Sequence, residues 1–142
     1  MPVKAYDLTG RTAFITGAAS GIGRATALLL SEAGATVHCA DRDEQGLQET
    51  AALIAKAGGT AHTYPLDVTD RAQVDRAIAT AAATPTGPTP TGPDGTATAP
   101  RLDITAAIAG VMHSSPVLET RDEDLDRVLN INFKGVLYVC QA

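Results

Sequence analysis

The chain has 142 residues, the length of one ordinary domain, and its 44% hydrophobic and 19% charged residues are typical of a globular protein. A net charge of −5, no basic block and 4% aromatic residues argue against a nucleic-acid partner. No apolar run approaches the roughly 20 residues that span a bilayer, so we expect no membrane association and predict a cytoplasmic location. Cys39 and Cys140 lack neighbours at metal-ligand spacing, which predicts buried, reduced thiols and no metal site.

Short β-forming runs alternate with helical patterns along the first part of the chain. Strands are predicted at residues 12–16 and 36–40, because both runs are rich in β-forming residues and each stops at a glycine or an aspartate. Between them apolar residues recur at helical spacing, and Gly34 follows as a residue suited to end a helix. The predicted helical face consists of Ile22, Ala25, Thr26, Leu29 and Ala33.

The alternation continues after residue 40. A second helical pattern is expected to end at Gly58, and third and fourth strands are predicted at residues 60–65 and 103–108. Asp70 followed by Gln73 resembles a capping pair at the start of a third helix. Its apolar face consists of Val74, Ala77, Ile78 and Ala81.

Strands that alternate with helices indicate an α/β fold. Parallel neighbours need crossover connections, and helices provide them on both faces of the sheet. We therefore expect one domain over residues 1–142 with a parallel sheet at its centre. A last helix is predicted to begin near Thr120, with Glu123 completing a capping box.

Residues 84–100 interrupt this plan. The stretch repeats the sequence TPTGP and consists almost entirely of Thr, Pro, Gly and Ala. Its five prolines and three glycines cannot sustain a helix or a sheet ladder, so a solvated, flexible insertion is predicted. The alternative is a docking segment for a proline-recognising partner, which only Asp94 could anchor by charge.

A glycine-rich turn joins the first predicted strand to the first helix. In the sequence TGAASGIG, Gly17 can form the turn, Gly21 can let a diphosphate approach the backbone, and Gly23 can let helix and strand pack closely. The N–H groups of a helix N-terminus attract anions. The candidate diphosphate-binding residues are therefore these glycines with Ser20 and Ile22, and a plain tight turn is the alternative interpretation.

Asp41 stands at the end of the second predicted strand, 18 residues beyond Gly23. A carboxylate at this place can accept hydrogen bonds from the hydroxyl groups of an adenosine ribose, and it would repel a 2′-phosphate. Asp41 therefore favours NAD over NADP as the cofactor. The neighbouring Arg42 could pair with that phosphate, which keeps NADP as the less favoured cofactor. A merely solvated aspartate is the other interpretation.

Together these residues resemble the short-chain dehydrogenase/reductase family. The motif Thr-Gly-x-x-x-Gly-Ile-Gly at residues 16–23 is similar to that family's cofactor motif. Asp67-Val68 resembles the pair that meets adenine, and Ala109-Gly110 resembles the end of the fourth strand. The likeness covers nearly the whole chain outside the insertion. It implies a partial Rossmann-type, doubly wound parallel sheet with about four strands in the order 3-2-1-4, a nicotinamide cofactor, and hydride transfer between a small-molecule alcohol and a ketone.

Two departures from the family pattern stand out. Where the family carries Asn-Asn-Ala-Gly, residues 107–110 read Ala-Ile-Ala-Gly, so amides that would tie the fourth strand to its neighbours are missing. The family's catalytic serine and Tyr-x-x-x-Lys pair have no counterpart in these 142 residues. The resemblance therefore implies the cofactor-binding half of an enzyme, inactive by itself. The fourth strand would be an edge open to association with another copy or another chain.

Asn132 is the one catalytic position that the resemblance assigns. The Asn-Phe-Lys-Gly at residues 132–135 matches the family segment whose asparagine supports a proton-relay water. On a helix, Asn132 would share the apolar face of Leu125 and Leu129, whereas Asn130 would lie on the polar side. A buried amide needs partners, because leaving it unsatisfied costs roughly 1 to 3 kcal/mol. We therefore predict a functional role for Asn132, with a purely structural amide as the alternative.

Three functions are compatible with this pattern. The first is an NAD(P)-dependent oxidoreductase of which the chain supplies the cofactor-binding half. The second is a non-catalytic dinucleotide-binding module or inactive fragment. The third is an S-adenosylmethionine methyltransferase, which also combines a glycine-rich turn with an acidic residue, but the spacing of the glycines at residues 17–23 and the pair Asp67-Val68 argue against it.

Overall fold

The computed structural model describes residues 6–85 and 101–142. Four parallel strands form one sheet in the order β3-β2-β1-β4, so the predicted α/β fold and Rossmann-type strand order are confirmed. The register places Ile15 on β1 beside Cys39 on β2 and Ala106 on β4. The strands are β1 (Thr12–Thr16), β2 (Thr36–Asp41), β3 (Ala61–Pro65) and β4 (Ile104–Ala107).

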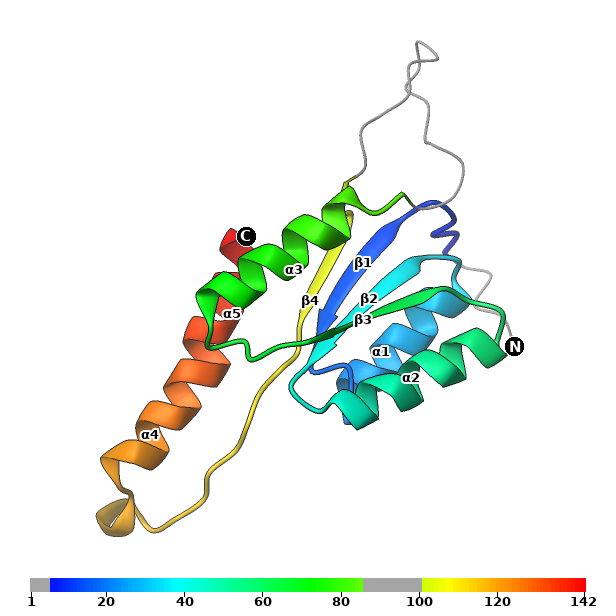
Figure 1. Cartoon of the computed structure of the whole chain (residues 1–142). Helices are drawn as coiled ribbons and strands as arrows, with labels where there is room; N and C mark the ends of the chain where they lie inside the picture. Colours follow the sequence, from blue (N-terminus) through cyan, green and yellow to red (C-terminus); the bar gives the residue numbers. More distant parts are fainter. Residues whose placement is uncertain (1–5, 86–100) are drawn as a thin grey trace.

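Helices cover both faces of this sheet, as Figure 1 shows. The helices α1 (Gly21–Glu32) and α2 (Glu44–Lys56) lie on one face, and α3 (Arg71–Ala83) and α5 (Val136–Gln141) lie on the other. A 3₁₀ turn, η1 (Val117–Glu119), precedes α4 (Asp122–Leu129), and a π-helical segment, η2 (Asn130–Gly135), joins α4 to α5. In Figure 1, α4 extends beyond the carboxyl ends of the strands.

The alternating side chains of the central strands build two cores. On the side of α1 and α2, Ile15 and Val37 pack with Leu47 and Ile54 of α2, and all four are fully buried. On the side of α3 and α5 the core consists of Phe14, Ala40, Leu66, Val68, Val74, Ala77, Ile78, Ala81 and Val139. A parallel sheet with helices on both faces buries its strands completely, which explains why β1 reads as an uninterrupted run without polar alternation.

The ends of the helices follow the predicted signals at Gly34, at Gly58 (φ +84°) and at Asp70, and Asp43 adds a cap that was not predicted. Gly34 has a φ of +102° directly after α1, as a left-handed residue that closes a helix. Asp70 Oδ1 accepts from the Gln73 N–H at 3.1 Å, while Gln73 Nε2 donates to Asp70 Oδ2 at 2.8 Å. Asp43 caps α2 by accepting from the Gly46 N–H at 3.1 Å.

Several expectations about the helices are wrong. Ile22 and Leu29 are 76% and 54% exposed, because α1 packs on the sheet through the smaller residues Gly23 and Ala27. Thr120 does not cap α4, which begins at Asp122 without a side-chain cap, because the Thr120 hydroxyl is turned back to the carbonyl of Pro116 after the 3₁₀ turn. The apolar face predicted for α4 is not buried, since Leu125 and Leu129 are 50% and 47% exposed where the helix passes beyond the sheet.

The predictions about the cysteines, the membrane and the insertion have mixed outcomes. Cys39 is buried and reduced as predicted, and burial raises the pKa of its thiol to about 12, but Cys140 is exposed rather than buried. Across residues 6–85 and 101–142, no helix is both long and apolar enough to cross a bilayer. The flexible insertion was predicted at residues 84–100, and residues 86–100 lie outside the described part of the chain.

A buried histidine makes the stability of this fold depend on pH. His38 is fully buried in β2, where Nδ1 lies 2.9 Å from the Tyr64 hydroxyl and Nε2 has no hydrogen-bond partner among the described residues. Burial, with a smaller contribution from the stacked His62, lowers the pKa of His38 to about 4 from the ordinary 6.5. The unfolded chain therefore binds this proton more tightly than the folded chain does. Folding stability consequently falls as the pH drops from about 6.5 to about 4.

The free energy of unfolding is expected to decrease by roughly 2 to 3 kcal/mol between pH 7 and pH 4 through His38 alone. In His38→Phe this component of the pH dependence should disappear, because phenylalanine carries no proton and fills the same apolar site. Urea unfolding at a series of pH values measures the slope, with His113→Gln, a change of an exposed histidine in the segment after β4, as the control. An unchanged slope in His38→Phe would contradict the assignment.

Candidate functional site

A cavity of about 500 Å³ opens where the carboxyl ends of the strands meet the N-terminus of α1. This is the edge at which open parallel α/β sheets bind their ligands. It brings together all of the residues that the sequence predicted to contact a cofactor. They are Gly17, Ser20, Gly21, Ile22, Gly23, Asp41, Arg42, Asp67, Val68, Ala109 and Gly110.

The glycines shape one wall of this cavity. Gly17 has a φ of +73°, and a Cβ built on it would lie 2.9 Å from the Ala109 nitrogen. The turn and the chain after β4 are therefore too close together for a side chain at residue 17. A Cβ on Gly23 would collide with the carbonyl of Gly17, which allows α1 to approach β1. Over Gly21, at φ +51°, a Cβ would meet nothing within 4 Å. The backbone at Gly21 is therefore open to a ligand, whereas the other two glycines serve internal packing.

The N-terminus of α1 is suited to an anion. The Ser20 side chain makes no capping hydrogen bond, and the first turn contains no acidic residue. The Arg24 N–H donates to the Ser20 carbonyl at 3.1 Å, while N–H groups earlier in a helix have no acceptor of their own within it. A negatively charged group at this end would meet these donors together with the positive end of the helix dipole.

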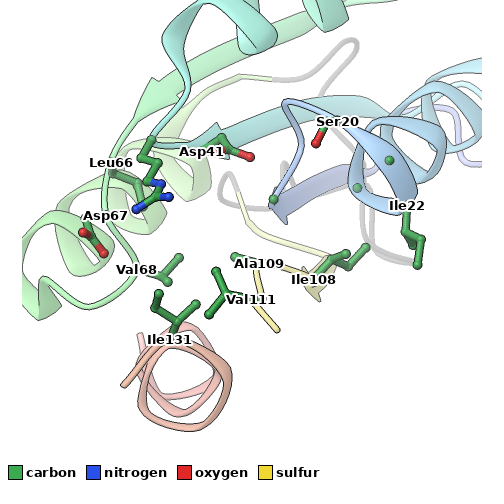
Figure 2. Close-up of a pocket in the computed structure, with 15 residues that line it drawn as sticks. Ser20, Ile22, Asp41, Leu66, Asp67, Val68, Ile108, Ala109, Val111 and Ile131 are labelled. Atoms are coloured by element: carbon green, nitrogen blue, oxygen red, sulfur yellow. The ribbon is translucent and has the colours of Figure 1, made fainter. Parts of the chain in front are cut away.

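Two carboxylates also line the cavity, and Figure 2 shows Asp41 close to Ser20 and Asp67 farther from the N-terminus of α1. Asp41 Oδ2 accepts from the Ala19 N–H and Oδ1 from the Asp43 N–H, each at 3.1 Å. A carboxylate can accept about four hydrogen bonds, so Asp41 retains acceptor capacity toward the cavity. Asp67 Oδ1 accepts from both the N–H and the hydroxyl of Thr69, and its Oδ2 has no hydrogen-bond donor within residues 6–85 and 101–142.

Apolar side chains line another wall of the cavity. Figure 2 shows Ile131 reaching from the helical segment toward Val68 and Val111. Val68 is 7% exposed and belongs to the core beneath the cavity. A flat apolar ring of a ligand could pack between these aliphatic groups without removing water from polar side chains.

The missing family amides are replaced by other hydrogen bonds. The Thr16 hydroxyl oxygen accepts from the N–H groups of Ile108 and Ala109 at 3.1 and 3.2 Å, so β1 continues to hold the chain after β4 ends. Asn132 binds both backbone groups of Val111: Oδ1 accepts from its N–H and Nδ2 donates to its carbonyl, each at 2.8 Å. The fourth strand is therefore tied to its surroundings without the two asparagines.

Asn132 has a different environment from the one predicted. It is exposed rather than buried, and it lies in the π-helical segment, where its neighbour Ile131 lines the cavity. Both the oxygen and the nitrogen of its amide nevertheless bond to Val111, another cavity-lining residue. Because π-helical turns often occur at functional sites, the position is notable, but the contacts of the side chain are those of a positioning group.

Four further residues line the cavity and were not predicted. They are Leu66, Ile108, Val111 and Ile131. Leu66 and Ile108 adjoin predicted residues directly after β3 and β4, so the rule that ligands bind beyond the carboxyl ends of parallel strands could have included them. Nothing in the local sequence signals that Ile131 returns to the same place from more than sixty residues along the chain from Leu66.

Comparison with known proteins agrees with this arrangement. A profile of the short chain dehydrogenase family matches residues 11–142. The chain is 38% identical over 128 residues to the probable oxidoreductase EphD of Mycobacterium bovis, covering 90% of this chain and 19% of that protein. It is 33% identical over 134 residues to the 3-oxoacyl-(acyl-carrier-protein) reductase FabG of Thermotoga maritima, covering 94% of this chain and 49% of that protein.

Solved structures show the same likeness in three dimensions. A short-chain type dehydrogenase/reductase from Mycobacterium marinum superposes with a TM-score of 0.80 at 33% identity, over 99% of this chain and 51% of that one. A 3-ketoacyl-(acyl-carrier-protein) reductase from Brucella melitensis, solved in complex with NADH, superposes with a TM-score of 0.77 at 29% identity, over 94% of this chain and 48% of that one. The chain spans about half the length of these structures and of FabG. The sheet order, the glycine-lined cavity and these matches together place the chain in the short chain dehydrogenase family.

Proposed function

We propose that the chain binds NAD(H) in the cavity and supplies the cofactor-binding half of an oxidoreductase that interconverts an alcohol and a ketone. The observation that carries this proposal is the chemistry of the cavity lining. It combines backbone N–H groups at the N-terminus of α1 with two carboxylates and several aliphatic side chains. That donor set fits a dinucleotide, whose diphosphate is anionic and whose riboses carry hydroxyl groups. The NADH complex of the related Brucella reductase supports the same ligand class.

Each part of the lining has a role in this proposal. The diphosphate lies against the first turn of α1, above the open backbone of Gly21. Asp41 accepts from the hydroxyl groups of the adenosine ribose, and Asp67 with Val68 borders the adenine. Ala109 and Gly110 border the other half of the cofactor, which supplies or accepts the hydride when bound. Asn132 acts there through Val111, by fixing the backbone that forms this wall.

Asp41 also gives the proposal its preference for NAD over NADP. Its carboxylate is held in place by the Ala19 and Asp43 N–H groups, so it cannot turn away from a 2′-phosphate without losing both bonds. Arg42 lines the cavity as well and is the group that would favour NADP. The fixed negative charge at the ribose is the stronger term, because a flexible exposed arginine loses entropy when it pairs with a phosphate.

Calorimetric titration of the chain with NAD, NADP and S-adenosylmethionine tests the proposal. We expect NAD to bind most tightly, and we expect Asp41→Ala to reduce the ratio of NAD to NADP affinity by about tenfold or more. The variant should weaken both cofactors to some extent, because the Ala19 N–H loses its acceptor. Asp75→Ala, which removes an exposed carboxylate paired with Arg71 on α3, is the matched control.

Two outcomes would overturn parts of this proposal. Tighter binding of S-adenosylmethionine than of NAD would replace the dinucleotide by a methyl-donor nucleoside. An unchanged NAD to NADP ratio in Asp41→Ala would show that Asp41 is only a structural partner of the glycine-rich turn.

A further inference from the structure

A hydrogen-bond network on the far side of the glycine-rich turn is centred on Arg24, the fourth residue of α1. Its guanidinium reaches across to α2, where Nε donates to the Thr50 hydroxyl and Nη2 forms an ion pair with Glu49, both at 3.0 Å. Nη2 also donates to the carbonyl of Ala19, directly before the helix, and approaches the Gly46 carbonyl at 3.3 Å. One side chain thus joins the turn to α2, although Arg24 is not among the residues that line the cavity.

Thr50 extends this network to the next carbonyl of the turn. Its side chain is fully buried, and its hydroxyl oxygen lies 2.9 Å from the Ala18 carbonyl oxygen and 3.0 Å from the Gly46 carbonyl oxygen, so these two acceptors share its single proton. The Thr50 hydroxyl oxygen also accepts from Arg24 Nε. The two consecutive carbonyls at Ala18 and Ala19 are therefore both held by groups from α1 and α2.

The N–H groups of these two residues are held from another direction. The Ala18 N–H donates to the Ala40 carbonyl at 3.2 Å, and the Ala19 N–H donates to Asp41 Oδ2 at 3.1 Å. All four backbone polar groups of Ala18 and Ala19 thus have partners outside the turn. A segment flanked by Gly17 and Gly21 has little conformational preference of its own, so these partners determine its shape.

We infer that Arg24, acting with Thr50, is a positioning residue for the diphosphate-binding turn. The network holds the two carbonyl oxygens toward α2, and an anion in the cavity then meets N–H groups without a carbonyl dipole facing it. Loss of the network would let the peptide after Ala19 rotate and present its oxygen to the diphosphate. This inference rests on the proposed NAD(H) site and adds to it a group that does not contact the cofactor.

The geometry, rather than the positive charge, is the important property of Arg24. Its charge is balanced by Glu49, and its fork of donors serves several acceptors at once. Lysine would keep the charge but offers a single ammonium group, which cannot reproduce this fork. Arg24→Lys is therefore expected to behave as a loss of function, whereas a simple electrostatic attraction would survive the change.

The test compares Arg24→Lys with Arg11→Lys, a control at the opposite end of β1, where Arg11 pairs with Asp103 at 2.8 Å. By calorimetry of the 142-residue chain, Arg24→Lys should weaken NAD about tenfold at both low and high salt. Affinity for adenosine, which has no diphosphate, should stay within about twofold of the parent chain. Amide hydrogen exchange of the unliganded variant should accelerate at Ala18 and Ala19 and leave β2 unchanged.

Each result decides the inference. Unchanged NAD affinity in Arg24→Lys would overturn it, and so would an equal loss for adenosine, which would indicate a general loss of structure. An effect that appears only at low salt would assign the residue to long-range attraction instead. If the parent chain bound no NAD, the proposed function would fail, and unchanged exchange at Ala18 and Ala19 would then overturn the bracing role independently.

Discussion

Gly23→Ala is expected to destabilise the chain by about 3 kcal/mol or more and to weaken NAD by about a hundredfold. The added Cβ would collide with the Gly17 carbonyl and lie 3.0 Å from the Ala18 nitrogen. These are backbone atoms, so no side chain can rotate aside. Gly17 has little room to move, because the backbone after β4 lies so near that a Cβ built on Gly17 would be 2.9 Å from the Ala109 nitrogen. The helix would have to move away from β1, and the anion-binding end of α1 would move with it.

This expectation runs against the ordinary preference of helices. Alanine within a helix is favoured over glycine by roughly 1 kcal/mol, so a substitution without the collision would stabilise α1. Urea unfolding followed by circular dichroism measures the change in stability, and calorimetry measures NAD affinity. Gly10→Ala separates the collision from backbone strain, because its φ of +74° costs about 1 to 2 kcal/mol by itself, although no atom lies within 4 Å of its Cβ position. A Gly23→Ala chain as stable as its parent would show that α1 and β1 can separate without loss.

The 142-residue polypeptide is expected to bind NADH without oxidising it when ketones are added. Hydride transfer to a carbonyl leaves an oxyanion that must receive a proton, and positioned acid–base groups contribute about 10² to 10⁴-fold each to such steps. The ionisable side chains that line the cavity are Asp41, Arg42 and Asp67, and the proposed function assigns all three to the adenosine half of the cofactor. Tyr64 is not available, because its hydroxyl is bonded to His38 within the core.

Absorbance of NADH with a panel of ketones measures this directly. Binding must be verified in the same samples by calorimetry, so that absence of turnover is not absence of cofactor. Tyr138, whose ring lies 5.4 Å from the guanidinium carbon of Arg71 on α3, is likewise outside the cavity lining. Rapid oxidation would show that an acid–base group within these 142 residues has been overlooked, and it would favour a complete active site over a cofactor-binding half.

Much of the fold follows from local sequence signals. The strands were placed within about one residue, because buried parallel strands such as residues 12–16 leave short β-forming runs between glycines. Gly34 and the pair Asp70 with Gln73 marked helix ends because their chemistry is local. The packed face of α1 was misassigned because it depends on contacts with a distant part of the chain. Helical periodicity favours the larger residues, whereas close contact with β1 selects the small ones, Gly23 and Ala27.

The candidate site divides in the same way. Residues at strand ends were predictable, because the carboxyl ends of parallel strands must meet at one edge. Ile131 was not, since its place depends on how the π-helical segment returns across the sheet. The burial predicted for Asn132 failed because the stripe that it shares with Leu125 and Leu129 is exposed where α4 and η2 extend from the sheet. The second acceptor role of Asp41, toward the Ala19 N–H, also required three-dimensional information.

In Figure 1, α3 ends and β4 begins near the amino ends of the strands, the end opposite the cavity. The start of β4 is anchored where Asp103 Oδ1 accepts from both Arg11 and Arg101 at 2.8 Å. A biotin or fluorophore attached at the end of α3 would therefore tether the polypeptide by the pole that faces away from the cavity. On a sensor surface, a molecule immobilised there would keep its cavity open to the solution.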